Sequence, residues 1–242
     1  MQTLIVNNKE EIGKQAAQLG AELINRAIDK KGYANVIFAT GSAQFEMLQN
    51  FVTQSIEWKS LNGFHLDEYI GLSINHKASF RKFLKERFVD IVHPGNFYYI
   101  NGEVDPNEEC KRLDKLIQQH PIDVAFVGIG ENSHLAFNDP PADFNTNEPY
   151  IQVTLDEACR KQQMGEGWFG SFDEVPKKAI SMSIRQILKS ESIIAVVPEQ
   201  RKAKAVQLTM ESVISPAVPA SALRWHSKTT LFLDRESSSL LK

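Results

Sequence analysis

The sequence has few cysteines and no long run of apolar residues. Only Cys110 and Cys159 occur in 242 residues, and both lie in polar, helix-like segments, so no disulfide framework is indicated. No apolar run approaches the roughly 20 residues that a membrane-spanning helix needs. The N-terminal stretch Met1–Asn7 lacks a basic region followed by a long apolar core, as a signal peptide would have. These absences predict a protein of the reducing cytoplasm.

Excess positive charge and metal-ligand spacing are also missing. The net charge of −3 provides no field that would attract nucleic acid, and the lysines and arginines are scattered. The six histidines and two cysteines show no spacing typical of a metal site. We therefore expect no nucleic acid, membrane or metal among the partners of this chain.

What the sequence does contain is an alternation of strand-like and helix-like segments. No repeat or linker divides the chain, so we expect a single domain over residues 1–242. The alternation predicts an α/β fold, in which a mostly parallel sheet carries helices on both faces. The expected helices are 9–30, 45–56, 77–89, 106–120, 184–189 and 199–210, and the expected strands are 35–40, 61–66, 122–127, 179–183, 192–197 and 229–233.

The most informative segment is 128–141, Gly-Ile-Gly-Glu-Asn-Ser-His-Leu-Ala-Phe-Asn-Asp-Pro-Pro, which follows the apolar run 122–127. Its two glycines allow a sharp turn and a close approach of the backbone to a ligand. His134 follows, with carboxylates at Glu131 and Asp139. An imidazole beside a carboxylate that orients it suits proton transfer. The alternative is a glycine-rich turn with a structural histidine.

Polar groups also follow three other predicted strands. The turn Thr40-Gly41-Ser42-Ala43-Gln44 begins a helix, where backbone N–H groups suit a phosphate, although simple helix capping would explain it equally. Asp67 and Glu68 are adjacent acids, and their repulsion can raise the pKa of one toward that of a base near neutral pH; helix capping is again the alternative. Lys202, next to Arg201, could reach the same anion or lie on the surface as an ordinary cation.

Four predicted strands thus end in a polar functional group: Thr40, Asp67, His134 and Lys202. The carboxyl ends of parallel strands meet at one edge of a sheet, and ligands bind there. The sequence therefore predicts that these four residues share one cleft.

The chain resembles the glucosamine-6-phosphate deaminase (isomerase) family, which shares its fold with 6-phosphogluconolactonase, over nearly its whole length. The motifs are 66–72 (Leu-Asp-Glu-Tyr-Ile-Gly-Leu), 128–138, 175–180 (Val-Pro-Lys-Lys-Ala-Ile) and 201–203 (Arg-Lys-Ala). The resemblance implies a Rossmann-like sheet and a reaction without metal or cofactor. The ring of glucosamine 6-phosphate opens, a proton moves from C2 to C1, and fructose 6-phosphate and ammonia result.

The resemblance also implies roles for individual residues. Asp67 occupies the position of the C2–C1 proton-transfer base, and His134, oriented by Asp139, that of the ring-opening group. Lys202 and the turn 40–44 match the phosphate-binding positions. The other expected site residues are Asn132 and Glu131 for catalysis, and Glu68, Gly130 and Arg160 for binding the substrate.

Several positions depart from the family pattern. Typical deaminases have Asp where this chain has Asn132 and Glu where it has Asp139, and their phosphate turn is richer in Gly and Thr. A phosphate-binding Arg expected around 160–168 has no clean match, and Arg160 is the nearest substitute. Two alternatives remain open. Glu131 fits the Gly-x-Gly-Glu-Asp-Gly-His pattern of the lactonases, and Asn132 would fit a sugar-phosphate sensor without turnover.

Two further expectations concern the molecule as a whole. The chain ends soon after the last predicted strand, so it has little room for the C-terminal segment of the allosteric, hexameric members of the family, and we expect a monomer or a small homo-oligomer. The segment 144–168 is interpreted as a loop that could act as a lid.

Overall fold

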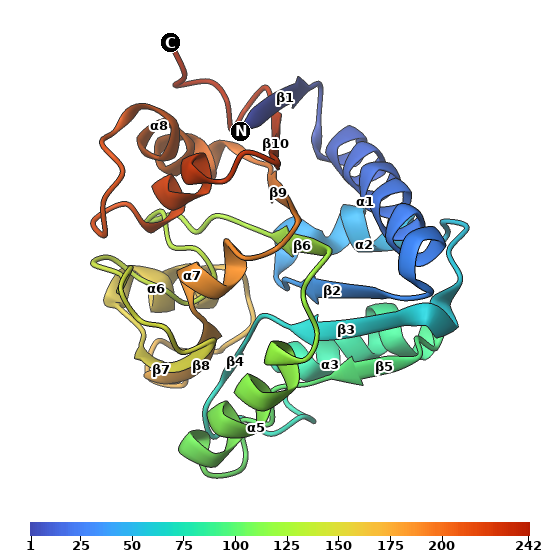
Figure 1. Cartoon of the computed structure of the whole chain (residues 1–242). Helices are drawn as coiled ribbons and strands as arrows, with labels where there is room; N and C mark the ends of the chain where they lie inside the picture. The colour runs from blue at the N-terminus through green and yellow to red at the C-terminus, as the bar shows by residue number, and fades with distance from the viewer.

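Seven parallel strands form the centre of the molecule, in the order β1-β10-β9-β6-β2-β3-β5 (Figure 1). The structure, a computed structural model, describes all residues 1–242. The parallel sheet predicted from the sequence is confirmed. Its strands are β1 (Gln2–Val6), β2 (Ala34–Phe38), β3 (Leu61–His65), β5 (Asn96–Tyr98), β6 (Val124–Val127), β9 (Ser192–Val197) and β10 (Thr229–Asp234).

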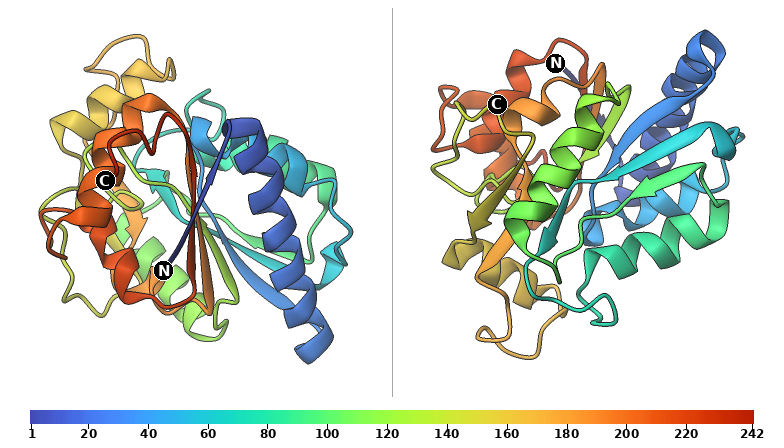
Figure 2. Two further views of the ribbon diagram at one scale, coloured as in Figure 1. Left: turned by 90° about the horizontal axis from the view of Figure 1, so that it is seen from above. Right: turned by 60° about the horizontal axis from the view of Figure 1, so that its bottom comes forward.

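Helices cover both faces of this sheet, as Figure 2 shows from above. Successive side chains of a strand point to opposite faces, so Val36 and Phe38 pack into one core and Ile37 into the other. The first core is closed by α1 (Lys9–Lys31), α2 (Phe45–Phe51) and α3 (Phe80–Leu84). The second core is closed by α5 (Pro106–Gln118), α7 (Ile184–Ile187) and α8 (Ala203–Glu211).

A second, antiparallel sheet of three strands lies beside the first, in the order β4-β8-β7. It consists of β4 (Asp67–Tyr69), β8 (Lys178–Met182) and β7 (Tyr150–Thr154). Leu66 joins the two sheets, because its N–H donates to Phe38 O (3.2 Å) and its carbonyl accepts from Met182 N (2.9 Å). The buried Tyr150 hydroxyl adds a second link by donating to His65 O at 3.0 Å. The chain therefore changes sheets between two consecutive strands.

The elements differ from the sequence prediction in several places. The segment 144–168 is no irregular loop, since it contains β7 and α6 (Glu157–Gly165). The predicted helix 77–89 starts only at Phe80, because Ser79 caps it by accepting from Lys82 N, and it continues as a π-helical turn and the short α4 (Asp90–Val92). β1 and β5 were not predicted, because each is a short edge strand with little apolar alternation.

The longest helix, α1, packs unusually close to its neighbours. A Cβ on Gly13 would lie 2.6 Å from the backbone carbonyl carbon of Glu46 in α2, and one on Gly20 would lie 2.3 Å from the Phe126 ring. Glycines at these two positions therefore let α1 hold α2 and β6 in place. No helix of the molecule, α1 included, is both long and apolar enough to cross a membrane.

Candidate active site

A cavity opens at the carboxyl ends of β2, β3 and β6. The chain passes from β2 to β3 and β5 on one side and returns to β6 on the other side of β2. Such a reversal of strand order is the usual place for a ligand in an open parallel sheet. The wall consists of residues 39–44, Leu66, Asp67, Phe80, residues 128–130, His134, Ala136, Phe137, Gln162, Gln163, Glu166 and Lys202.

The four residues predicted to share one cleft, Thr40, Asp67, His134 and Lys202, all line this cavity. The candidates Gly41, Ser42, Ala43 and Gly130 line it as well. Gly130 has a clear steric reason, because a Cβ there would lie 2.2 Å from the His134 ring. Position at strand ends thus placed these residues correctly, although it does not by itself establish what each one does.

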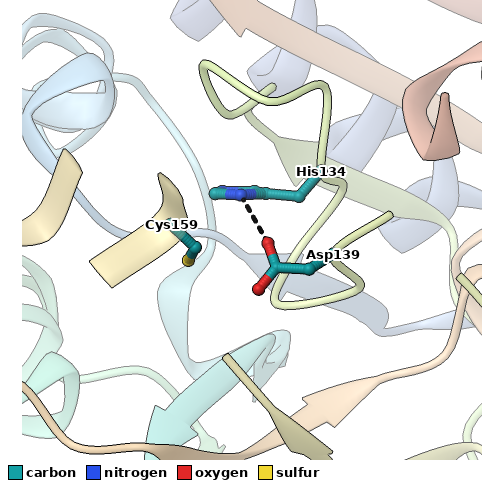
Figure 3. A group of neighbouring side chains, drawn as sticks. All are labelled: His134, Asp139 and Cys159. Atoms are coloured by element: carbon teal, nitrogen blue, oxygen red, sulfur yellow. Dashed lines mark ion pairs between the residues drawn. The ribbon is translucent and has the colours of Figure 1, made fainter. Parts of the chain in front are cut away.

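His134 is held against Asp139, with 3.1 Å between Nδ1 and Oδ1 (Figure 3). The loop that carries the ring turns through Ser133, whose φ of 68° is left-handed. The other oxygen of Asp139 accepts from Asp156 N at 2.9 Å. Burial acts to raise the pKa of the Asp139 carboxyl, but the contacts with His134, Asn132 and Asp156 hold it below its ordinary value. Asp139 therefore stays ionised and can fix the orientation of the imidazole.

Asn132 supports this pair without lining the cavity. Its Nδ2 donates to Asp139 Oδ1 and to Asp156 Oδ2, both at 2.9 Å, and its Oδ1 accepts from His134 N at 3.1 Å. A carboxylate in its place could accept the last of these bonds but could not donate the first two. Asn132 is therefore a positioning residue for Asp139 and, through it, for His134.

Asp67 begins β4, directly after the residue that joins the two sheets. It is almost fully buried, and no protein group bonds to its carboxylate. Burial, together with the neighbouring charge of Glu68, raises the pKa of Asp67 to about 8. A carboxyl group in this range can exchange a proton near neutral pH, as a general base requires.

Glu68 does not line the cavity, which corrects the expectation that it binds substrate. It points to the start of α3, where its carboxylate accepts from Ser79 Oγ (3.0 Å), Phe80 N (3.3 Å) and Arg81 N (2.8 Å). It also pairs with the Arg81 guanidinium at 3.6 Å. Helix capping, the alternative considered for this residue, describes its contacts.

Arg160 is likewise turned away from the cavity. Its Nε and Nη2 donate to Val175 O at 3.2 and 2.9 Å, and Nη2 also donates to Phe172 O at 2.8 Å. The guanidinium carbon lies 4.0 Å from the centroid of the Phe172 ring. Arg160 thus fastens the loop after α6, and the expectation that it binds phosphate is wrong because its side chain does not line the cavity.

Lys202 is the cation that does face the cavity, with only 3% of its surface exposed. Burial lowers the pKa of its ammonium to about 8, while the nearby carboxylate of Glu166 acts in the opposite direction. Lys202 lies beside the turn 40–44 in the cavity wall. An ammonium next to a turn that begins a helix is suited to a phosphate group.

Arg201, the neighbouring cation, lies outside the cavity. Its guanidinium pairs with Glu131 (3.2 Å), Glu166 (3.2 Å) and Glu199 (2.7 Å), and its Nη2 donates to Ser42 Oγ at 2.9 Å. Glu131, predicted as a catalytic residue, is therefore committed to an ion pair and does not line the cavity. Arg201 connects the turn 40–44 with the loop after β6 and with the end of α6.

Three polar residues of the wall were missed from the sequence: Gln162, Gln163 and Glu166. Gln44 and Gln163 are buried, and the Oε1 of each has no hydrogen-bond partner in the protein. A buried acceptor without a partner is costly unless a ligand supplies the donor. Glutamine inside a helical segment carries no sequence signal for this, since its neighbours in space come from other parts of the chain.

Cys159 lies next to the His134–Asp139 pair, as Figure 3 shows. One potential ligand atom from each of the three residues lies within 4.8 Å of the others, as a metal site would need. However, burial raises the pKa of the Cys159 thiol well above its ordinary value, so the thiolate that binds metals is disfavoured. Cys159 is therefore a neutral thiol next to Asp139 and not a metal-binding thiolate.

Comparison with known proteins shows the family of the chain. Over 248 residues the chain is 36% identical to the glucosamine-6-phosphate deaminase of Bacillus pumilus, covering 99% of this chain and all of that protein. It is 34% identical over 245 residues to the enzyme of the same name from Lactobacillus delbrueckii subsp. bulgaricus, covering both chains completely.

Solved structures of known proteins share the fold of this chain. A monomeric glucosamine-6-phosphate deaminase superposes with a TM-score of 0.90 at 32% identity, over 99% of this chain and 100% of that one. A 6-phosphogluconolactonase from Shewanella baltica reaches a TM-score of 0.81 at 18% identity, over 97% of each chain, and shares the fold. The model of the family of glucosamine-6-phosphate isomerases and 6-phosphogluconolactonases matches residues 7–232, and the chain belongs to this family.

Proposed function

We propose that the protein is an enzyme that converts glucosamine 6-phosphate and water to fructose 6-phosphate and ammonia. The observation that carries the proposal is the meeting of a buried base, Asp67, with the oriented His134–Asp139 pair in one cavity. The activity named for the relatives from Bacillus pumilus and Lactobacillus delbrueckii supports it.

In the first step of this mechanism, His134 opens the sugar ring. A proton must leave the C1 hydroxyl and another must reach the ring oxygen. The imidazole can carry both, because its ring lines the cavity and its Nδ1 lies 3.1 Å from the Asp139 carboxylate. The product of this step is the open-chain aldehyde of the amino sugar.

Asp67 carries the second step. Its carboxylate removes the proton from C2 while a proton of the substrate ammonium passes to the C1 oxygen, which gives an enolamine between C1 and C2. The carboxylate then returns its proton to C1. The C2 iminium that results adds water, and loss of ammonia leaves the ketone of fructose 6-phosphate. The raised pKa of Asp67 makes its carboxylate a stronger base than an exposed aspartate.

The phosphate group belongs, in this proposal, at the turn 40–44. Lys202 supplies the charge, and Ser42 lies in the wall beside it. These contacts are present both before and after the chemical step, so they contribute mainly to binding. Replacing Lys202 by Ala should therefore raise KM more than it lowers kcat.

The decisive experiment measures ammonia and fructose 6-phosphate released from glucosamine 6-phosphate. Equal amounts of both are expected from the wild type, and neither from Asp67→Asn. Asp173→Asn, the same change at an exposed position, is the matched control and should keep wild-type turnover. Turnover that survives in Asp67→Asn would contradict the assignment of the base.

Lactone hydrolysis, the reaction of the 6-phosphogluconolactonase relatives, is less well supported. It rested on Glu131, which pairs with Arg201 outside the cavity. A sensor without turnover rested on Asn132, which has a positioning role here. Binding of glucosamine 6-phosphate with no product would favour the sensor, and opening of a sugar-acid phosphate lactone that survives Asp67→Asn would favour the lactonase.

We further propose that the enzyme works in the cytoplasm, where its phosphorylated substrate would be found, and that it needs no metal. We propose a monomer or small homo-oligomer, because the similar solved deaminase is described as monomeric.

A further inference from the structure

The cavity wall contains a carboxylate that neither step of the proposed reaction uses. The Glu166 side chain is only 6% exposed, and it lies just beyond α6. It accepts from Gln162 Nε2 at 3.1 Å and from Trp168 Nε1 at 3.3 Å. Burial acts to raise its pKa, but Gln162, Arg201, Lys202 and Trp168 hold it below the ordinary value. Glu166 is therefore negatively charged at neutral pH.

Glu166 also forms an ion pair with Arg201, a cation just outside the cavity wall. Arg201 reaches Ser42 of the phosphate turn with Nη2, while its Nη1 pairs with Glu166 and Glu131 at 3.2 Å each. Glu199 holds the Nε of the same guanidinium at 2.7 Å. Three carboxylates thus surround one guanidinium, and only Lys202 remains to neutralise an anion inside the cavity.

The charges of the cavity wall consequently do not favour a ligand that carries only negative charge. At pH 7 Glu166 is a carboxylate and Lys202 an ammonium, whereas the raised pKa of Asp67 leaves that group mostly protonated; His134 completes the titratable groups that line the cavity. Like charges in a poorly solvated site repel strongly. A ligand with both an ammonium and a phosphate group matches such a wall better than a ligand with a phosphate group alone.

We propose that Glu166 is a specificity-determining residue that weakens the binding of purely anionic ligands, so that the zwitterionic amino sugar phosphate is favoured over inorganic phosphate and over the sugar phosphate product. It does so by opposing the anion and by occupying Arg201. The substrate named here rests on the proposed function, but the effect on phosphate does not. Weak binding of the anionic product also favours its release.

The experiment titrates inorganic phosphate and fructose 6-phosphate into the protein at pH 7 by calorimetry. Glu166→Gln should bind both about threefold more tightly or better, since it removes the charge and keeps the shape. Glu199→Gln is the matched control: it removes an equal charge from Arg201 but lies outside the cavity, so its phosphate affinity should rise less than that of Glu166→Gln. Unchanged or weaker phosphate binding by Glu166→Gln would overturn the proposal, as would equal tightening in both variants.

A second arm tests the link to Arg201 and does not depend on Glu166→Gln alone. Arg201→Gln leaves Glu166 without its partner, so phosphate should bind about threefold more weakly or worse, although Arg201 is outside the cavity. The double variant Glu166→Gln/Arg201→Gln should recover most of that loss. An equal loss in the single and double variants would show that Arg201 acts without Glu166 and would overturn the proposal. Both arms measure binding, so a failure to release ammonia would count against the proposed function only.

Discussion

A single amide, Asn132, holds two carboxylates and a backbone N–H in one small volume. Both of its N–H groups are used, toward Asp139 and Asp156, and its oxygen accepts from His134 N. Asn132 and Asp139 therefore complement each other, because the amide donates a hydrogen bond that the carboxylate accepts.

Asn132→Asp should therefore destabilise the protein. The new carboxylate would face those of Asp139 and Asp156, and this repulsion would raise the pKa of Asp139 in the folded state. Stability relative to the wild type should be similar below about pH 4 and fall as pH rises, by about 1–3 kcal/mol at neutral pH. Urea unfolding of both proteins at pH 4 and pH 7 measures this. A variant as stable as the wild type at pH 7 would contradict the assigned bonds.

The pH profile of kcat/KM follows from two residues with pKa values of about 8. Asp67 acts when it has lost its proton, so activity should rise with pH on the acidic side. Lys202 acts while it keeps its proton, so activity should fall on the alkaline side, with a narrow maximum near pH 8. Lys202→Arg should extend the alkaline limb, because arginine stays charged. Identical alkaline limbs in the two proteins would exclude Lys202 as their cause.

At the level of elements, β4 and α3 are joined by one side chain. Glu68 leaves β4 and bonds the first turn of α3 through Ser79, Phe80 and Arg81. Its charge also contributes to the raised pKa of the neighbouring Asp67. One capping residue therefore both orders a helix and influences the proposed base.

Glu68→Gln should separate these two effects. Losing charge-assisted bonds in a buried position should cost about 2–4 kcal/mol of unfolding free energy. The acidic limb of kcat/KM should move to lower pH, because one of the causes that raise the pKa of Asp67 is gone. Denaturant unfolding and a pH profile test the two parts, and an acidic limb that stays in place would refute the second. Glu103→Gln, which removes an exposed partner of Arg81, is the control for the ion pair.

Sequence patterns predicted the parallel sheet and its site better than they predicted the small sheet. Long apolar runs such as 192–197 mark buried parallel strands, and the residues after them must reach one edge. Residues 150–154 alternate in burial on a short strand, and only the partner 178–182 reveals them. Glu68 and Arg160 were misassigned for the same reason, since a charged side chain is free or committed according to its partners in the fold.

For the whole molecule we expect a monomer or a small homo-oligomer in solution. Sedimentation should give a mass of 27.3 kDa or a small multiple of it. Adding glucosamine 6-phosphate should not change the mass. A stable hexamer would contradict this expectation.

The position of Leu66 ties turnover to the arrangement of the whole molecule. Its N–H belongs to the parallel sheet and its carbonyl to the antiparallel one, and Asp67 is the next residue. The proposed base thus directly follows the residue whose backbone links the two sheets. Conditions that separate the two sheets would abolish activity while the larger sheet was still intact. Loss of activity would therefore report partial unfolding before the whole molecule unfolds.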